Sequence, residues 1–242
     1  MCSSDLASLI FLSGYLCKLQ KLNFLKWQET LDLIATDEEL VHWYAEACWR
    51  SELNDHNAQV IIKLIKEDKV KLSELGFFRF GTAVKNLSKE IFKEWIEYLL
   101  AQNTLEAIAI AVGLFFSFYI FQEESSIPQD LALRVITAKS LMEKDRQIAR
   151  AIDYGWFTIV EKYIKQYSEQ TEALLDFMLD NFGEDDTVFD SYDYAKRALN
   201  EIIKVDPVMA WKKITGCFNK NLKEFKLQLW LGGNLTDRKS VV

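Results

Sequence analysis

The sequence is poor in the two residues that interrupt regular structure most strongly, with 2 prolines and 9 glycines among 242 residues. A β-sandwich or a doubly wound α/β domain needs many tight turns and normally uses more of both. Apolar residues recur at helical spacing through almost the whole chain. The sequence therefore predicts an all-α fold of about a dozen helices joined by short polar links.

Several predicted helices begin at a residue whose side chain can accept a hydrogen bond from the first helical turn. Asn23, Asn54, Ser88 and Asp206 each precede an apolar-periodic segment in this way. One further helix is expected to begin near Pro128. The other predicted helices cover residues 7–19, 23–34, 36–48, 54–65, 75–84, 88–99, 104–121, 144–167, 168–183, 191–204, 208–218 and 222–231.

Helices of about 10–20 residues with links of about 2–6 residues favour antiparallel neighbours, that is, helical hairpins. Successive predicted hairpins begin roughly 35–40 residues apart, which is the range of the helical repeat families. Over most of residues 20–231 the chain resembles irregular α-solenoid regions of the HEAT and tetratricopeptide kinds. The tetratricopeptide consensus itself is absent, so the resemblance implies a solenoid arm and no particular chemistry.

The two ends, Met1–Leu6 and Asp237–Val242, are the peptides that common sequencing-adapter DNA would encode. We therefore expect residues 7–236 to be a single helical repeat domain taken from inside a longer protein of bacterial or environmental origin. On that expectation the first and last helices should expose apolar faces, with residues such as Ile10, Leu12 and Leu16, because native neighbours would be missing.

Charge, cysteine spacing and hydropathy argue against nucleic-acid binding, a disulfide framework and a membrane span. The net charge of −7 gives no general attraction to phosphate backbones, so nucleic acid is not an expected partner. Cys17, Cys48 and Cys217 are scattered without a Cys-x-x-Cys motif, which favours buried reduced thiols in a cytoplasmic protein. Residues 107–121 are uncharged but fall short of the ~20 that cross a bilayer, so we expect a buried helix and no membrane span.

No catalytic, cofactor-binding or metal-binding pattern can be identified. Glu39 and His42 have the Glu-x-x-His spacing of di-iron bundles, but such bundles need that motif twice and two more glutamates. Gly76 and Gly81 have the glycine spacing of a P-loop without its lysine. We expect no cofactor, and an enzymatic activity is not favoured. The tryptophans fit core packing, with Trp49 expected to be partly exposed.

Charge is unevenly distributed toward the C-terminal end. Residues 168–195 hold nine acids and no Lys or Arg, whereas residues 196–226 hold eight basic side chains against three acids. Four of the acids lie three or four apart and form a stripe along one predicted helix: Glu169, Glu172, Asp176 and Asp180.

Two interpretations of this acidic stripe stay open. In the first, the acidic and basic helices are neighbours that neutralise each other, or they simply face water. Alternatively, the stripe is a docking surface for a basic protein partner. For the loop that follows the stripe, residues 184–193, a calcium site is a separate interpretation, which the irregular oxygen spacing disfavours.

The leading functional hypothesis is a non-catalytic protein-interaction or regulatory arm of a larger protein. Its partner would be another protein or another domain of the same chain. The alternative is a helical sensor or accessory region of a multidomain bacterial NTPase, or of another enzyme whose catalytic domain lies outside these residues. A nucleic-acid-binding helical array would need a basic concave face.

Overall fold

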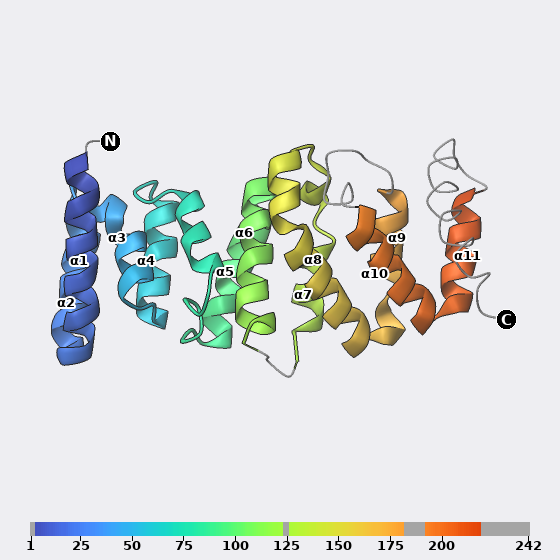
Figure 1. The fold of residues 1–242 in the computed structure, drawn as a ribbon, viewed down its shortest axis with the longest axis horizontal. Helices are drawn as coiled ribbons and strands as arrows, with labels where there is room; N and C mark the ends of the chain where they lie inside the picture. The colour runs from blue at the N-terminus through green and yellow to red at the C-terminus, as the bar shows by residue number, and fades with distance from the viewer. Residues whose placement is uncertain (1–2, 123–125, 182–191, 219–242) are drawn as a thin grey trace. The chain divides into compact units, whose positions relative to one another are not determined.

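The computed structural model of the chain describes residues 3–122, 126–181 and 192–218. These residues form the α-helices α1 to α11, several short 3₁₀ segments and one π-helical turn, and they contain no β-strand (Figure 1). The all-α prediction is therefore confirmed. Two compact units divide the chain: unit 1 comprises residues 1–102 and 113–124, and unit 2 comprises residues 103–112 and 125–242.

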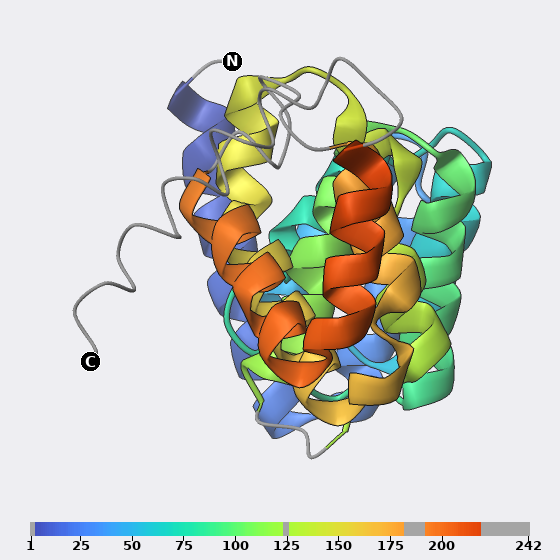
Figure 2. The same cartoon turned by 90° about the vertical axis from the view of Figure 1, so that its right-hand side faces the viewer.

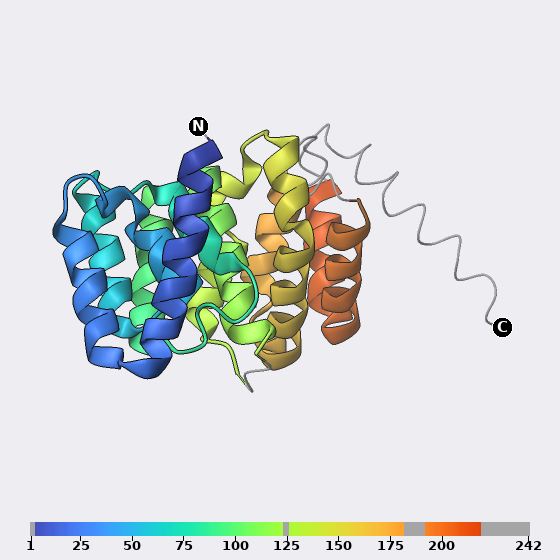
Figure 3. The ribbon, with the colours of Figure 1, turned by 60° about the vertical axis from the view of Figure 1, so that its left-hand side comes forward.

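Unit 1 contains five complete α-helices and two 3₁₀ segments. Helix α1 lies beside α2 and α3, and α4 packs on α3 and α5 (Figure 3). The 3₁₀ segments are Val41–Trp43 and Leu72–Arg79. The helices are α1 (Ser3–Leu22), α2 (Phe24–Thr36), α3 (Tyr44–Ser51), α4 (Asp55–Lys66) and α5 (Lys89–Gln102).

Unit 2 contains the C-terminal helices. Helix α8 packs on α7 and α10, and α11 packs on α9 and α10, as Figure 2 shows with α11 in red. Helix α6 (Leu105–Phe115) begins in unit 2, and its last three residues belong to unit 1. The others are α7 (Gln129–Ile136), α8 (Arg146–Gln166), α9 (Glu172–Asp180), α10 (Tyr192–Val205) and α11 (Pro207–Phe218).

Aromatic side chains fill the core of unit 1. Trp95 is 1% exposed, and its indole Nε1 donates a 3.1 Å hydrogen bond to the carbonyl oxygen of Ala58. Phe92 stacks on Phe118 with ring centroids 4.0 Å apart and meets the edge of Tyr119. Such pairs contribute roughly 0.5–1.5 kcal/mol beyond the burial of their area. They tie α5 to the segment that follows α6.

The core of unit 2 also contains a buried tryptophan whose indole donates a hydrogen bond to a backbone carbonyl oxygen. Trp156 is fully buried on α8, and its Nε1 donates a 2.9 Å hydrogen bond to the carbonyl oxygen of Ile136 at the end of α7. The hydroxyl of Tyr167 donates to the carbonyl oxygen of Ile127, and the Gln166 side chain accepts from the Ile127 amide. The acceptor for the Trp156 indole is stabilising, because an unpaired polar group inside a protein is costly.

The uncharged segment 107–121 is mostly buried, as predicted, although its last residue, Phe121, is 55% exposed. Leu105–Phe115 forms α6, and Phe116–Ile120 continues it as a π-helical turn, in which the Phe121 amide donates a 2.9 Å hydrogen bond to the carbonyl oxygen of Phe116. None of the helices in the described ranges is both long and apolar enough to cross a bilayer.

The side chain of Arg79 passes so close to α6 that only glycine fits at position 113 without a clash. A Cβ atom built on Gly113 would lie 2.6 Å from Cδ and 2.8 Å from Cγ of Arg79. The backbone carbonyl of Arg79 in turn accepts a hydrogen bond from the Ser117 hydroxyl. Glycine at position 113 therefore lets the Arg79 side chain cross this face of the helix.

Four predicted helix caps are confirmed. The side chains of Asn23 and Asn54 accept hydrogen bonds from Lys26 N and Asn57 N at 3.1 and 2.8 Å. Ser88 accepts from Ile91 N, and Asp206 accepts from Met209 N at 2.9 Å. Each cap satisfies an amide hydrogen that the helix itself cannot use.

Other predicted boundaries are wrong. Residues 37–40 form a turn, because the Asp37 carboxylate accepts hydrogen bonds from the amides of Glu39 and Leu40, and α3 begins only at Tyr44. Residues 75–84 are not an α-helix: a 3₁₀ segment ends at Arg79. Turns follow it, and Gly81 adopts a φ of +66° that favours glycine. The helix predicted over residues 222–231 lies outside the described residues.

The expected apolar face of α1 is wrong at Leu16, which is fully buried because α1 packs against both α2 and α3. Leu12 is half-buried, and the side chain of Ile10 lies outside the described residues. Exposed apolar side chains do occur elsewhere on α1, at Leu22 (71%), and on α2, at Leu25 (73%) and Leu33 (69%).

Candidate functional site: a groove between α9 and α11

Helix α9 has one apolar and one acidic side. Leu174, Leu175 and Met178 are completely buried. Glu172 and Asp176 lie four residues apart on the other side, and Asp180 follows after four more. Residues four apart are stacked on one helix face, and because the opposite face of α9 is the buried one, the acids point away from the core.

Helix α11 faces α9 with a mixed surface. Asp206 caps its first turn and Pro207 occupies the first helical position, where a missing amide hydrogen costs nothing. Ala210 and Ile214 are buried against the rest of unit 2, whereas Val208 is 78% exposed.

Lys213 joins the two helices. Its ammonium nitrogen lies 2.7 Å from Glu172 Oε1 and 2.7 and 2.8 Å from the two carboxylate oxygens of Asp176. Hydrogen bonds to Asp176 and Glu172 raise the pKa of Lys213, and the hydrogen bond from Lys213 lowers the pKa of Glu172. Both shifts favour the charged forms of Lys213 and Glu172, and the contacts of Lys213 with Glu172 and Asp176 hold α11 against α9.

A groove of about 730 Å³ lies between these two helices. Its volume falls within the ~300–1,000 Å³ typical of ligand sites in proteins. The lining combines carboxylates, two lysines and apolar surface: Glu172, Asp176, Asp180, Asp206, Val208, Met209, Lys212, Lys213 and Gly216.

The acidic stripe is thus brought partly into one site. Glu172, Asp176 and Asp180 line the groove, whereas Glu169 lies in the 3₁₀ segment Ser168–Gln170 before α9 and does not. The predicted start of this helix at Ser168 is wrong, since α9 begins at Glu172. The proposed calcium loop at 184–193 lies outside the described residues but for its last two, whose side chains are not described.

Sequence reasoning missed Asp206, Val208 and Met209 as site residues. The sequence predicts Asp206 only as a helix start, and its place in the groove lining follows from where α11 packs. Val208 did carry a signal, because it is an apolar residue two positions before buried Ala210 and off the buried Ala210–Ile214 line. Among the described tryptophans, Trp211 on the same helix is exposed by 67%, whereas Trp49 is only partly exposed beneath Arg50.

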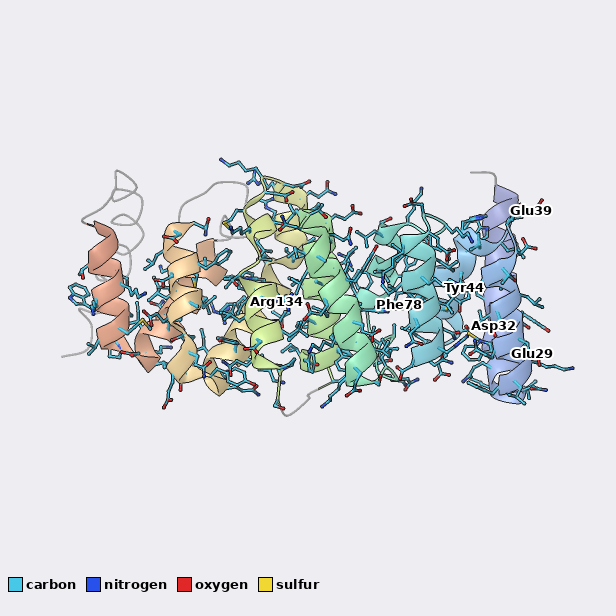
Figure 4. The ribbon with its side chains drawn as sticks, turned by 180° about the vertical axis from the view of Figure 1, so that it is seen from behind. Glu29, Asp32, Glu39, Tyr44, Phe78 and Arg134 are labelled. Atoms are coloured by element: carbon cyan, nitrogen blue, oxygen red, sulfur yellow. The ribbon has the colours of Figure 1, made fainter. Side chains whose placement is uncertain are left out.

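A separate polar cluster lies inside unit 1. Asn57 is fully buried, and its Oδ1 accepts hydrogen bonds from Gln28 Nε2 at 2.7 Å and from the Tyr44 hydroxyl at 3.1 Å. Asp32 on α2 lies near Tyr44 (Figure 4). Burial raises the pKa of both Tyr44 and Cys48, which therefore stay neutral and unreactive. The cluster connects α2, α3 and α4 and offers no activated nucleophile.

The histidines do not form a metal site with their neighbours. His56 Nε2 lies 3.1 Å from Asp32 Oδ1, and the His42 ring packs on Trp43 with centroids 4.7 Å apart. Glu39 and His42 lie in a turn and a 3₁₀ segment, so the Glu-x-x-His spacing does not fall on an α-helix. Within the described ranges, no group of three or more His, Cys, Asp and Glu side chains is placed to hold a metal ion.

No family model, no curated protein and no solved structure matches the chain. A proposal for its function therefore depends on the chemistry of its surfaces.

Proposed function

We propose that the chain is a non-catalytic protein-interaction arm that presents the α9–α11 groove to a protein partner. The observation that carries the proposal is the combination of exposed Val208 and the carboxylates around it in one groove. An apolar side chain that remains 78% exposed inside a concave surface gains free energy when a partner covers it, at roughly 25 cal/mol per Å² of buried apolar area.

The proposal includes stacked helical hairpins of the α-solenoid kind and a cytoplasmic setting. Successive helices that pack on one another, such as α3 on α4 and α4 on α5, support the first. Free thiols at Cys17 and Cys48 support the second, because cysteines stay reduced in that compartment. An accessory region of a larger enzyme would use the same groove for another domain of its own chain.

A display library of helical peptides, selected against the full chain, tests the proposal. We expect selected peptides to lose binding when Val208→Asp places a charge in the groove. Leu33→Asp is the matched control, since Leu33 is an aliphatic residue of unit 1 that is 69% exposed, close to the 78% of Val208. If the selected peptides respond equally to both substitutions, or to neither, the groove is not the interaction surface.

A further inference from the structure

The groove retains unbalanced negative charge after its internal pairing. Its lining contains four carboxylates and two lysines, a net charge of −2. Lys213 is already engaged by Glu172 and Asp176. Asp206 uses one carboxylate oxygen to cap α11 through Met209 N.

Asp180 is the carboxylate with no such partner. It is exposed, and it makes no ion pair with any residue that the structure describes. It is also the last residue of α9, where the helix dipole places partial negative charge. Asp176 lies four residues earlier, which adds a repulsion between like charges.

The position of Asp180 therefore opposes helix stability in two ways. A lysine there would favour both the dipole and the pairing with Asp176, and it would keep the side chain in water. An acid is thus the poorer choice for the folded chain alone. A cation that approached along the groove would relieve both unfavourable terms at once.

Apolar surface lies beside this carboxylate. Val208 and Met209 belong to the same groove lining as Asp180. The nine residues of α9 are about 13 Å long, which corresponds to between two and three turns of a partner helix. A ligand that matches the groove needs apolar side chains for Val208 and Met209 and a cation within reach of Asp180.

We propose that the partner of this groove is an amphipathic helix with lysine or arginine beside its apolar face, and that Asp180 pairs with that cation. The inference rests on the proposed function and names the chemistry of its partner. Helix-in-groove binding of this kind uses apolar side chains at i, i+3, i+4 and i+7 for affinity. The charge pair then selects among partners.

Three synthetic helical peptides test the inference by fluorescence anisotropy with the full chain. They share one leucine face and carry Lys, Gln or Glu at the flanking positions. We expect the Lys peptide to bind more tightly than the Glu peptide, with a preference that shrinks as salt screens the charges. Asp180→Asn should weaken the Lys peptide about two- to fivefold, the contribution of one partly exposed ion pair.

Asp180→Lys should reverse the order, so that the Glu peptide binds more tightly than the Lys peptide. Glu143→Lys is the matched control, because Glu143 is an exposed acid of unit 2 outside the groove lining. This control should leave the order of the peptides unchanged. Thermal unfolding adds a readout that a structural role would not give: Asp180→Lys should raise the unfolding midpoint while it weakens the Lys peptide.

The outcomes separate the inference from the proposed function. Equal binding of all three peptides, lost with Val208→Asp and unchanged with Asp180→Lys, would overturn the cationic partner and leave the interaction groove in place. A Lys preference that responds to Glu143→Lys as strongly as to Asp180→Lys would also overturn it. Binding that ignores Val208→Asp would overturn both proposals.

Discussion

Replacing Gly113 by alanine should destabilise unit 1, although alanine is the better helix former. In a helix interior alanine is favoured over glycine by about 0.8–1.0 kcal/mol. The added Cβ would overlap Cδ and Cγ of Arg79 at 2.6 and 2.8 Å, and Arg79 Cβ lies only 3.0 Å away. Overpacking of this kind costs roughly 1–3 kcal/mol. We therefore expect Gly113→Ala to lower the free energy of unfolding by about 1 kcal/mol.

A double-mutant cycle isolates the cause. Arg79→Ala removes the two closest atoms, so Gly113→Ala in that background should be neutral or stabilising by up to about 1 kcal/mol. The coupling between the two substitutions should then be about 1–2 kcal/mol. Gly14→Ala on α1 is the control: nothing lies within 4 Å of its Cβ, and it should stabilise the chain.

Urea unfolding followed by tryptophan fluorescence and by circular dichroism measures all of these variants. The reasoning is refuted if Gly113→Ala stabilises the chain as much as Gly14→Ala does. It is also refuted if the effects of Gly113→Ala and Arg79→Ala simply add, because the overlap would then play no part.

Three other predictions concern single residues. Burial raises the pKa of Glu74, so the folded state favours its protonated form and stability is lost as the pH rises through that pKa. Glu74→Gln should therefore stabilise the chain at pH 7 by less than ~1 kcal/mol. At pH 3 the variant and the native protein should unfold at the same urea concentration. Trp156→Phe should cost about 2–4 kcal/mol in the same assay, because it leaves the Ile136 carbonyl without its donor and opens a cavity. Iodoacetamide should modify Cys17 well before buried Cys48 in the native chain, as peptide mass spectrometry would measure; equal rates would contradict the burial described for Cys48.

The helices could be predicted from sequence because their signals are local. Asn23 and Asn54 mark helix starts through bonds to amides three residues away, and apolar spacing marks the buried side of each helix. The 3₁₀ segment that ends at Arg79 could not be predicted in this way. Its geometry accompanies the crossing of Gly113 by the Arg79 side chain, a contact between segments far apart in the sequence.

For the groove, the sequence likewise predicts the local arrangement of side chains but not the contact between helices. Spacing placed Glu172, Asp176 and Asp180 on one side of a helix, but it could not say which other helix approaches that side. Lys213 determines that this helix is α11, since it pairs with two of the three acids across the groove. The two open interpretations of the stripe therefore need not exclude each other. Lys213 neutralises part of the stripe, and Asp180 retains the charge that the proposed partner would pair with.

The division of the chain into units has a consequence for its synthesis. Residues 113–124 belong to unit 1, yet residues 103–112, which precede them, belong to unit 2. When Gln102 leaves the ribosome, the residues of all five helices, α1 to α5, have been synthesised. Phe118 has not, so Phe92 lacks its stacking partner. Unit 1 can close only after part of unit 2 has emerged. A protein shortened at residue 102 should consequently expose apolar surface and aggregate, even though it would contain every complete helix of its unit.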